Sequence, residues 1–371
     1  MTDFPIQHRP VLPAKKDYRI ALCGAGGVVN DAHLPAYSKA GFHVVGIFDP
    51  RRESAKQTAA RFGIPRVYGK LEELGGDSQV DIVDIAVPAS ENLGLVEKLA
   101  PAGKALLLQK PMAEDFETAL KTVAAVDRAK VRAAVNQQMR WEPGIRATKS
   151  LLDAGWLGEL YNIAVLNFVD TPWHLWGWLM KKPQIEVLYH SIHYIDSIRF
   201  LTGRMPGLVF CDGSRKPGHE SAGETRICLQ MIFKDNLRAT IVSNHHASHG
   251  LEGQQSEFRI EGTEGAASRK MGLNMNYPKG VPDAYRFASS RLGAKRWMNV
   301  EFAETWIPDA FVGPMASLMR AMSGEIERPE TDVHDNLDTL RLIFTAYESM
   351  ATRMAVSPGD ISSGVDQGVH N

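Results

Sequence analysis

The first 140 residues alternate short apolar runs with amphipathic stretches, and this rhythm constrains the fold more than any other feature. The apolar runs are YRIALC (18–23), HVVGIFD (43–49), VDIVDIAVP (80–88), KALLLQKP (104–111) and RAAVNQ (132–137). Near-continuous apolar strands separated by helices are typical of a parallel sheet that helices cover on both faces. We therefore predict an α/β domain with a doubly wound parallel sheet over residues 18–140.

The rhythm changes after residue 140. Long stretches such as 160–170, 237–247 and 256–268 alternate apolar and polar residues, with turns between them. This pattern indicates a mostly antiparallel open sheet, and hence an α+β second domain over residues 141–371 that ends in a helix at about 335–354. A length of 371 residues also favours two domains. The polar, proline-bearing residues 1–17 are interpreted as an N-terminal extension.

Charge and composition narrow the range of partners. A formal net charge of −1 and a pI near 6.9 give no reason to expect nucleic acid or an anionic membrane, so a small molecule is the expected partner. No run of 18 apolar residues and no apolar leader segment is present, which favours a cytoplasmic protein. Cys23, Cys211 and Cys228 lack metal-ligand spacing and are predicted to be buried thiols.

A glycine-rich loop follows the first apolar run. Gly24, Gly26 and Gly27, followed by Val28, stand between a strand and a helix, where backbone N–H groups can approach a pyrophosphate. Val29 occupies the position where the usual spacing has a small residue, so slightly looser packing of helix on strand is expected.

Asp49 lies at the end of the second strand, where an acid accepts hydrogen bonds from the adenosine ribose diol. This residue favours NAD as the cofactor. The neighbouring Arg51 and Arg52 could instead hold a ribose phosphate, so NADP stays open as the alternative.

Two segments carry candidate catalytic groups. Lys110 ends the apolar run 104–111, at the edge of a parallel sheet where ligands bind. Residues 183–203 are predicted to form a helix with Leu188, Ile192, Ile195 and Ile198 on one side. At 100° per residue, the other side carries Glu186, Tyr189, His190, His193 and Asp196 within about 120°. A face so rich in ionisable groups is expected to meet a ligand.

Several segments together resemble one family, the glucose-fructose oxidoreductase and inositol dehydrogenase family (Gfo/Idh/MocA), over nearly the whole chain. The matching pieces are GAGGVVNDAHLPAY, VDIAVP, AGKALLLQKPMA, NQQMRWEPG, LLDAGWLGE, HYIDSIRFLTG and FRIEGTEGA. The resemblance implies a Rossmann domain and a C-terminal α+β domain whose open sheet mediates homodimers or homotetramers. It also implies that sugars, polyols or their derivatives are oxidised or reduced with NAD(P).

The resemblance carries roles onto individual residues. Lys110 matches the family lysine that hydrogen-bonds the substrate oxygen near the nicotinamide, and His193 matches the histidine that acts as acid and base. Removing a hydride from a carbinol requires that the hydroxyl proton also leave, and a histidine titrates near the working pH. Val87, Pro88, Gln109 and Asn136 are expected to border the cofactor.

Two positions depart from the family pattern. Gln109 replaces a glutamate, which removes a negative charge beside Lys110 and is expected to favour proton loss from that lysine. Tyr189 stands where many members have an aspartate, so we expect it to donate a hydrogen bond to substrate. His190 is expected to take over part of the polar role of that aspartate. Arg140, Trp141, Trp173 and Asp196 complete the expected substrate set, and Trp173 lies in an aromatic stretch suited to a sugar face.

Alternatives stay open at the sequence level. No metal is predicted, yet Glu186, His190 and His193 have a spacing that could hold one. His245, His246 and His249 could line the site or form a strand end. The favoured function is hydride transfer between NAD(P) and a secondary alcohol of a sugar, sugar acid or cyclitol. Its rivals are a redox-neutral oxidoisomerase, epimerase or lyase with a transient keto intermediate, a metal-dependent lyase and a non-catalytic regulator.

Overall fold

A computed structural model describes residues 4–293 and 296–361. The chain forms two compact units. The first contains Arg9–Glu142 and Glu304–Asp338, and the second contains the described residues up to His8, those of Pro143–Ala303 and those from Thr339 onward. Each unit is described by itself.

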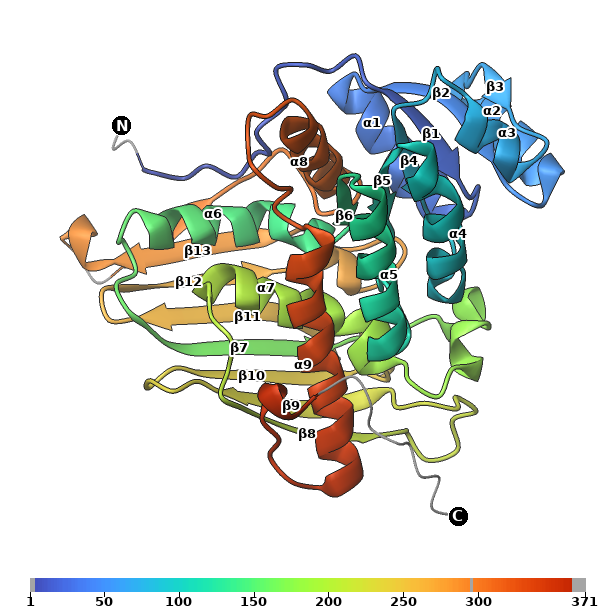
Figure 1. Cartoon of the computed structure of the whole chain (residues 1–371). Coiled ribbons are helices and arrows are strands. Elements are labelled where there is room, and N and C mark those ends of the chain that lie inside the picture. The colour runs from blue at the N-terminus through green and yellow to red at the C-terminus, as the bar shows by residue number, and fades with distance from the viewer. Residues whose placement is uncertain (1–3, 294–295, 362–371) are drawn as a thin grey trace. The chain divides into compact units, whose positions relative to one another are not determined.

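The first unit is built on a parallel sheet, as predicted. Its strand order is β3-β2-β1-β4-β5-β6, and every neighbouring pair is parallel (Figure 1). The strands are β1 Arg19–Cys23, β2 His43–Phe48, β3 Arg66–Val67, β4 Ile82–Ile85, β5 Ala105–Leu108 and β6 Ala133–Val135. The helices are α1 Leu34–Ala40, α2 Arg52–Phe62, α3 Leu71–Gly76, α4 Asn92–Leu99, α5 Phe116–Ala129 and α8 Val312–Met322.

The register of this sheet aligns the strand ends that precede the predicted cofactor residues. Cys23 pairs with Ile85, Ile85 pairs with Leu108, and Leu108 pairs with Val135. Because the strands are parallel, the residues that follow them emerge at one edge of the sheet. The glycine loop, Val87, Gln109 and Asn136 therefore belong to the same edge.

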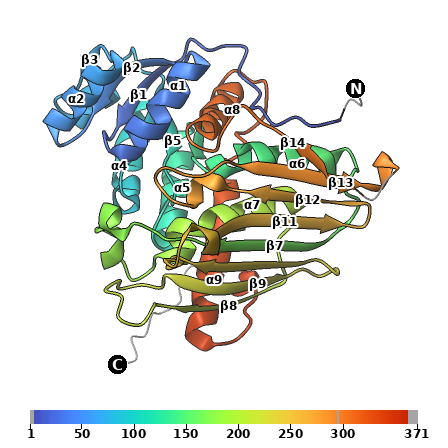
Figure 2. The same cartoon turned by 180° about the vertical axis from the view of Figure 1, so that it is seen from behind.

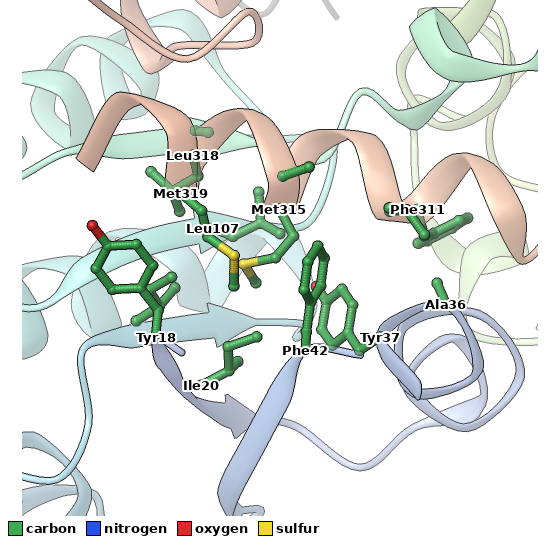
Figure 3. Packing of buried hydrophobic residues seen from close by; sticks show 14 of the residues in the cluster. Tyr18, Ile20, Ala36, Tyr37, Phe42, Leu107, Phe311, Met315, Leu318 and Met319 are labelled. Atoms are coloured by element: carbon green, nitrogen blue, oxygen red, sulfur yellow. The ribbon is translucent and has the colours of Figure 1, made fainter. Parts of the chain in front are cut away.

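The packing of helix α8 explains why the first unit includes residues 304–338, which come late in the sequence. Phe311, Met315, Leu318 and Met319 are fully or almost fully buried against Tyr18, Ile20, Tyr37, Phe42 and Leu107 (Figure 3). Burying each large side chain is worth roughly 1.5–3 kcal/mol. The structure thus places 304–338 with the parallel sheet, whereas the sequence boundary at residue 140 left that segment in the second domain.

The second unit contains a mixed sheet of eight strands in the order β14-β13-β12-β11-β7-β10-β9-β8. Only β7 and β10 pair in parallel among the described strands of this sheet, so the prediction of a mostly antiparallel sheet is confirmed. The strands are β7 Leu160–Phe168, β8 Leu208–Ser214, β9 Arg226–Ile232, β10 Arg238–Asn244, β11 Gln255–Gly262, β12 Gly265–Lys270, β13 Ala284–Ser289 and β14 Met298–Val300.

Helices cover one face of this sheet. They are α6 Pro143–Asp153, α7 Ile192–Thr202 and α9 Val333–Thr352, and in Figure 2 the strands lie in front of them. Alternate residues of β8 point away from the helices, so Leu208 and Phe210 are exposed while Val209 and Cys211 are buried. The cysteine prediction is correct for Cys23 and Cys211 but wrong for Cys228, which lies on the exposed face of β9.

The described residues near both chain ends pack within these units. The ring of Phe4, in the predicted N-terminal extension, packs edge-on against Trp156 and Phe287 of the second unit, with centroid distances of 6.0 and 5.3 Å. The C-terminal helix α9 begins two residues before its predicted start, and the boundary between the units falls within it. Among the described residues, no helix is long and apolar enough to cross a membrane.

Candidate active site

The glycine loop of the first unit leaves its backbone open. Gly24 has φ 115°, and a Cβ atom there would lie 2.3 Å from the carbonyl oxygen of Ala86, so only glycine fits. A Cβ at Gly26 would meet nothing within 4 Å, and one at Gly27 would meet only the Asp31 side chain at 3.8 Å. Val28 is 36% exposed at the loop's end. This loop fits a pyrophosphate that is bound by backbone N–H groups.

The segment after the loop shows how Val29 is accommodated. A π-turn over Val29–His33 precedes α1, and the Val29 side chain is fully buried in the cluster that contains Leu22 and Ile47. The residue that departs from the usual small-residue pattern is therefore part of the core.

Asp49 holds the glycine loop in place. It is 6% exposed, and its two carboxylate oxygens accept hydrogen bonds from the backbone N–H groups of Ala25 and Arg51, each at 2.8 Å. The guanidinium of Arg51 lies 3.5 Å from the same carboxylate and is largely exposed. The acid predicted to bind ribose thus fixes the turn that is predicted to bind a pyrophosphate.

Gln109 ends a chain of buried polar contacts that starts at Asp84. The Nδ2 of Asn136 donates to Gln109 Oε1 at 2.9 Å and lies 3.2 Å from His33 Nε2. His33 Nδ1 is 2.7 Å from Asp84 Oδ2, which also accepts a hydrogen bond from Tyr37 at 2.7 Å. Burial, then the charge of Asp84, raises the pKa of Tyr37 well above its usual value. The side chain beside Lys110 is therefore fixed by a network that includes groups with no exposed surface.

Lys110 follows Gln109 directly and is half-buried at the edge of the sheet where β5 ends. Val87 is half-buried and Pro88 is exposed at the end of the neighbouring strand β4. The predicted cofactor residues of the first unit therefore follow adjacent strands at one edge.

Arg140 and Trp141 have structural partners. Arg140 is 5% exposed and donates to the Glu330 carbonyl at 2.7 Å and to Asp335 at 2.5 Å. Trp141 packs so closely on Gly313 that a Cβ there would lie 2.1 Å from the indole. These contacts tie 304–338 to the first unit, and they favour a structural role over the predicted substrate role.

In the second unit, the predicted helix 183–203 is divided. Glu186–His190 form a π-turn, and α7 runs from Ile192 to Thr202. The predicted apolar side is confirmed, because Leu188, Ile192, Ile195 and Ile198 are at most 1% exposed.

The predicted polar side does not stay together. Asp196 is fully buried and accepts a 2.7 Å hydrogen bond from Thr339 on α9. The ring of Tyr189 packs edge-on against Trp178, at a centroid distance of 5.5 Å. A π-turn has i to i+5 hydrogen bonds, so the angular spacing assumed for a regular α-helix fails here. The burial of Asp196 and its hydrogen bond from Thr339 favour a structural role over the predicted substrate role.

Glu186 is the centre of a compact polar cluster. Its Oε2 lies 3.1 Å from His190 Nδ1 and 2.5 Å from His245 Nε2, and the carboxylate has no exposed surface. Burial alone would raise the pKa of Glu186, but the two imidazoles outweigh that effect and hold the pKa well below its usual range. Glu186 is therefore an ionised carboxylate beside two histidines.

His245 joins this cluster from the end of β10. Its ring stacks on that of His190 at 4.5 Å between centroids. His193, one turn further along α7, is 7% exposed. The structure thus brings His245, instead of His193, to Glu186 and His190, while His249 is exposed.

Trp173 lies among four histidines. Its ring centroid is 5.4–6.1 Å from those of His190, His219, His245 and His246. Burial, followed by the neighbouring His219, lowers the pKa of His246 to about 4, so this histidine is neutral near pH 7. Trp173 is 9% exposed and forms an aromatic cluster with these four histidines in the second unit.

Sequence reasoning missed His33, Asp84 and His219. Asp84 had a usable signal, because a carboxylate in the middle of an apolar strand requires a buried partner. No comparable signal pointed to His219, which lies in a loop between β8 and β9.

The parallel sheet, the open glycine loop and the acid at the end of β2 are typical of a dinucleotide-binding domain. Two family models match the chain: "Oxidoreductase family, NAD-binding Rossmann fold" over residues 18–137, and "GFO/IDH/MocA C-terminal domain" over residues 145–268. The chain belongs to the Gfo/Idh/MocA family of NAD-binding oxidoreductases.

Relatives extend over most of the chain. D-apiose dehydrogenase from Paraburkholderia graminis is 26% identical over 347 residues, covering 90% of this chain and 88% of that protein. Inositol 2-dehydrogenase from Rhizobium meliloti is 21% identical and covers 91% and 98%. An oxidoreductase from Agrobacterium radiobacter, solved with NAD+, L-tartaric acid and magnesium, has the same fold, with a TM-score of 0.80, 21% identity and coverage of 92% and 99%.

Proposed function

We propose that this protein is an NAD(P)-dependent dehydrogenase that acts on a secondary alcohol of a sugar, sugar acid or cyclitol. The observation that carries the proposal is the common sheet edge, which presents the glycine loop after β1 and Lys110 after β5. The names of the relatives support the substrate class, since they include D-apiose dehydrogenase and inositol 2-dehydrogenase.

Two residues carry the proposed chemistry. The bound nicotinamide would supply the hydride acceptor. Lys110 would donate a hydrogen bond to the reacting oxygen and stabilise the negative charge that develops on it. His193 would accept the hydroxyl proton, because a neutral imidazole is a competent base near pH 7.

We propose NAD as the preferred cofactor. Asp49 is anionic and fixed at the end of β2 by two backbone hydrogen bonds, so a phosphate on the adenosine ribose would be repelled there. Arg51 is the feature that would have to compensate if NADP were used.

We also propose a homodimer or homotetramer formed through the exposed face of the eight-stranded sheet. Leu208 and Phe210 form a short exposed apolar row on β8, and Cys228 is exposed on the neighbouring strand β9. The exposed Asp212 pairs with Cys228, and the exposed Gln230 pairs with Phe210. Such a row on an open sheet is suited to a partner surface of the same kind.

The test of the enzymatic function mixes the purified full-length protein with NAD or NADP and a panel of polyols, sugars and sugar acids. The absorbance of reduced nicotinamide is the readout. We expect a signal that falls about 10²–10³-fold in Lys110→Met and about 10²–10⁴-fold in His193→Ala.

His249→Ala, at an exposed histidine, is the matched control and should keep full activity. Silence across the panel, together with tight cofactor binding, would contradict net dehydrogenation. It would instead favour chemistry that returns the hydride to the substrate.

A further inference from the structure

The geometry points to a site for a divalent transition-metal ion formed by Glu186, His190 and His245 in the second unit. The Oε2 of Glu186, the Nδ1 of His190 and the Nε2 of His245 all lie within 4.8 Å of one another. Two imidazoles and one carboxylate are a donor set that binds ions such as Zn²⁺ and Fe²⁺.

The separations are close to those that a metal ion would set. With bonds of about 2.0–2.2 Å, two ligand atoms on one ion lie roughly 3–3.5 Å apart. Glu186 Oε2 lies 3.1 Å from His190 Nδ1 and 2.5 Å from His245 Nε2. An ion would therefore have to lengthen the second distance by roughly 0.5–1 Å.

The remaining polar atoms of two of these side chains are held by neighbouring hydroxyls. Ser191 Oγ donates to Glu186 Oε1 at 2.6 Å, and Thr171 Oγ1 lies 2.5 Å from His245 Nδ1. Partners of this kind orient a metal ligand and fix the imidazole tautomer. The ligand atoms of Glu186, His190 and His245 are therefore oriented toward the point where an ion would lie.

The charge of the carboxylate also suits an ion at this position. Glu186 has no exposed surface, and Ser191, His190 and His245 surround its carboxylate. A divalent ion would balance this charge, and the imidazoles facing the carboxylate would bind the ion as neutral ligands.

The site has one partly open side. His190 keeps 24% of its side-chain surface exposed, whereas Glu186 and His245 are buried. Three protein ligands leave positions on the ion for small-molecule oxygens. Vicinal hydroxyls or a hydroxy-acid would suit those positions. The existence of the site does not depend on the proposed dehydrogenase activity, because ion binding is measurable without cofactor or substrate.

The test uses full-length protein that has been stripped with a chelator and dialysed. Co²⁺ is titrated in while its visible absorption is recorded, and Zn²⁺ binding is measured by calorimetry. We expect one equivalent of each ion to bind, a Co²⁺ spectrum that shows nitrogen ligands, and no competition from excess Mg²⁺, because imidazole ligands disfavour that ion.

Variants then separate this site from adventitious binding. His190→Ala and His245→Ala should each weaken binding by at least about 100-fold, and Thr171→Val, which alters only a supporting contact, by about 10–100-fold. His246→Ala is the matched control, since that ring borders the same tryptophan but lies outside the trio, and it should keep one equivalent.

Two results would overturn the inference: no stoichiometric binding by the unaltered protein, or equal binding by the His190→Ala variant. Far-UV circular dichroism and thermal unfolding verify that each variant is folded. If His245→Ala does not fold, His190→Ala decides alone, because its partly exposed ring is the safer one to remove.

Discussion

Gln109 directly precedes Lys110, so a negative charge added at this position should raise the pKa of the lysine. Glutamate at this position keeps an oxygen that can accept the Asn136 hydrogen bond, so Gln109→Glu should change charge more than geometry. The added carboxylate should hold the Lys110 proton more tightly and move the basic limb of the kcat/KM profile upward by about one pH unit or more. Steady-state rates between neutral and alkaline pH measure this.

The same charge added elsewhere in the first unit is the control for that prediction. Gln57→Glu, on the exposed side of α2, should leave the basic limb in place. An unchanged basic limb in Gln109→Glu would show that Lys110 does not set it.

At the level of single residues, sequence motifs predicted which residues occupy the glycine loop. They did not predict which buried polar side chains are hydrogen-bonded to one another. Gly24 could be identified because its place after a strand requires a conformation that other residues avoid. The partner of Asp84 could not, because His33 lies 51 positions away and only the folded sheet brings them together. The partner of Arg140 could not be identified either, since Asp335 is 195 positions distant.

Among the elements, the start of α9 is joined to α5 by a histidine. His334 Nδ1 lies 2.7 Å from Asp332, and Nε2 lies 3.0 Å from Asp127. Burial lowers the pKa of His334, but the hydrogen bonds to Asp332 and Asp127 outweigh it, so the pKa is raised overall. A raised pKa in the folded state stabilises the protein below the unfolded-state value of about 6.5, and that stability is lost as pH rises through the folded-state pKa.

We therefore expect His334→Gln to lower the melting temperature at about pH 5.5 and to have little effect at about pH 9, where the histidine is neutral in both states. Thermal unfolding at the two pH values measures the difference. His43→Gln, at an exposed histidine of the same unit, is the control. Equal destabilisation at both pH values would mean that packing, and not charge, explains the effect.

Element types could be predicted from periodicity, whereas their local irregularities could not. Near-continuous apolar runs predicted the parallel strands because both faces of that sheet are covered. The π-turn at Glu186–His190 left the apolar pattern of the helix intact but changed which polar residues share a direction. His245, which follows β10, stacks on His190 only in the folded unit, and no local pattern encodes this contact.

For the whole molecule, the exposed face of the eight-stranded sheet predicts self-association. Phe210→Glu would place a charge in the apolar row of β8, and we expect the protein to shift toward monomer in sedimentation velocity. Leu251→Glu is the control, because Leu251 is similarly exposed, at 41%, but lies in a 3-10 turn outside the sheet. A sedimentation coefficient unchanged by Phe210→Glu would exclude this face as the interface.

The domain organisation could be predicted only where a unit is formed by one continuous segment of the chain. The change from parallel to alternating pattern after residue 140 marks the end of the first part of the parallel-sheet unit, at Glu142. Local composition does not indicate that 304–338 belongs to the same unit. The sequence of α8 is that of an ordinary apolar helix, and only the folded structure shows that it packs on Tyr18 and Phe42.

This arrangement has a consequence for biosynthesis. A chain that has been synthesised only as far as Glu142 contains every strand of the parallel sheet but lacks α8, so the cluster around Tyr18, Phe42 and Leu107 lacks the α8 side chains that complete it. Domains near the N-terminus usually fold first as a chain is made. Here the cofactor-binding unit is completed only after the whole eight-stranded sheet has been synthesised, and we expect its unfinished apolar surface to favour aggregation until then.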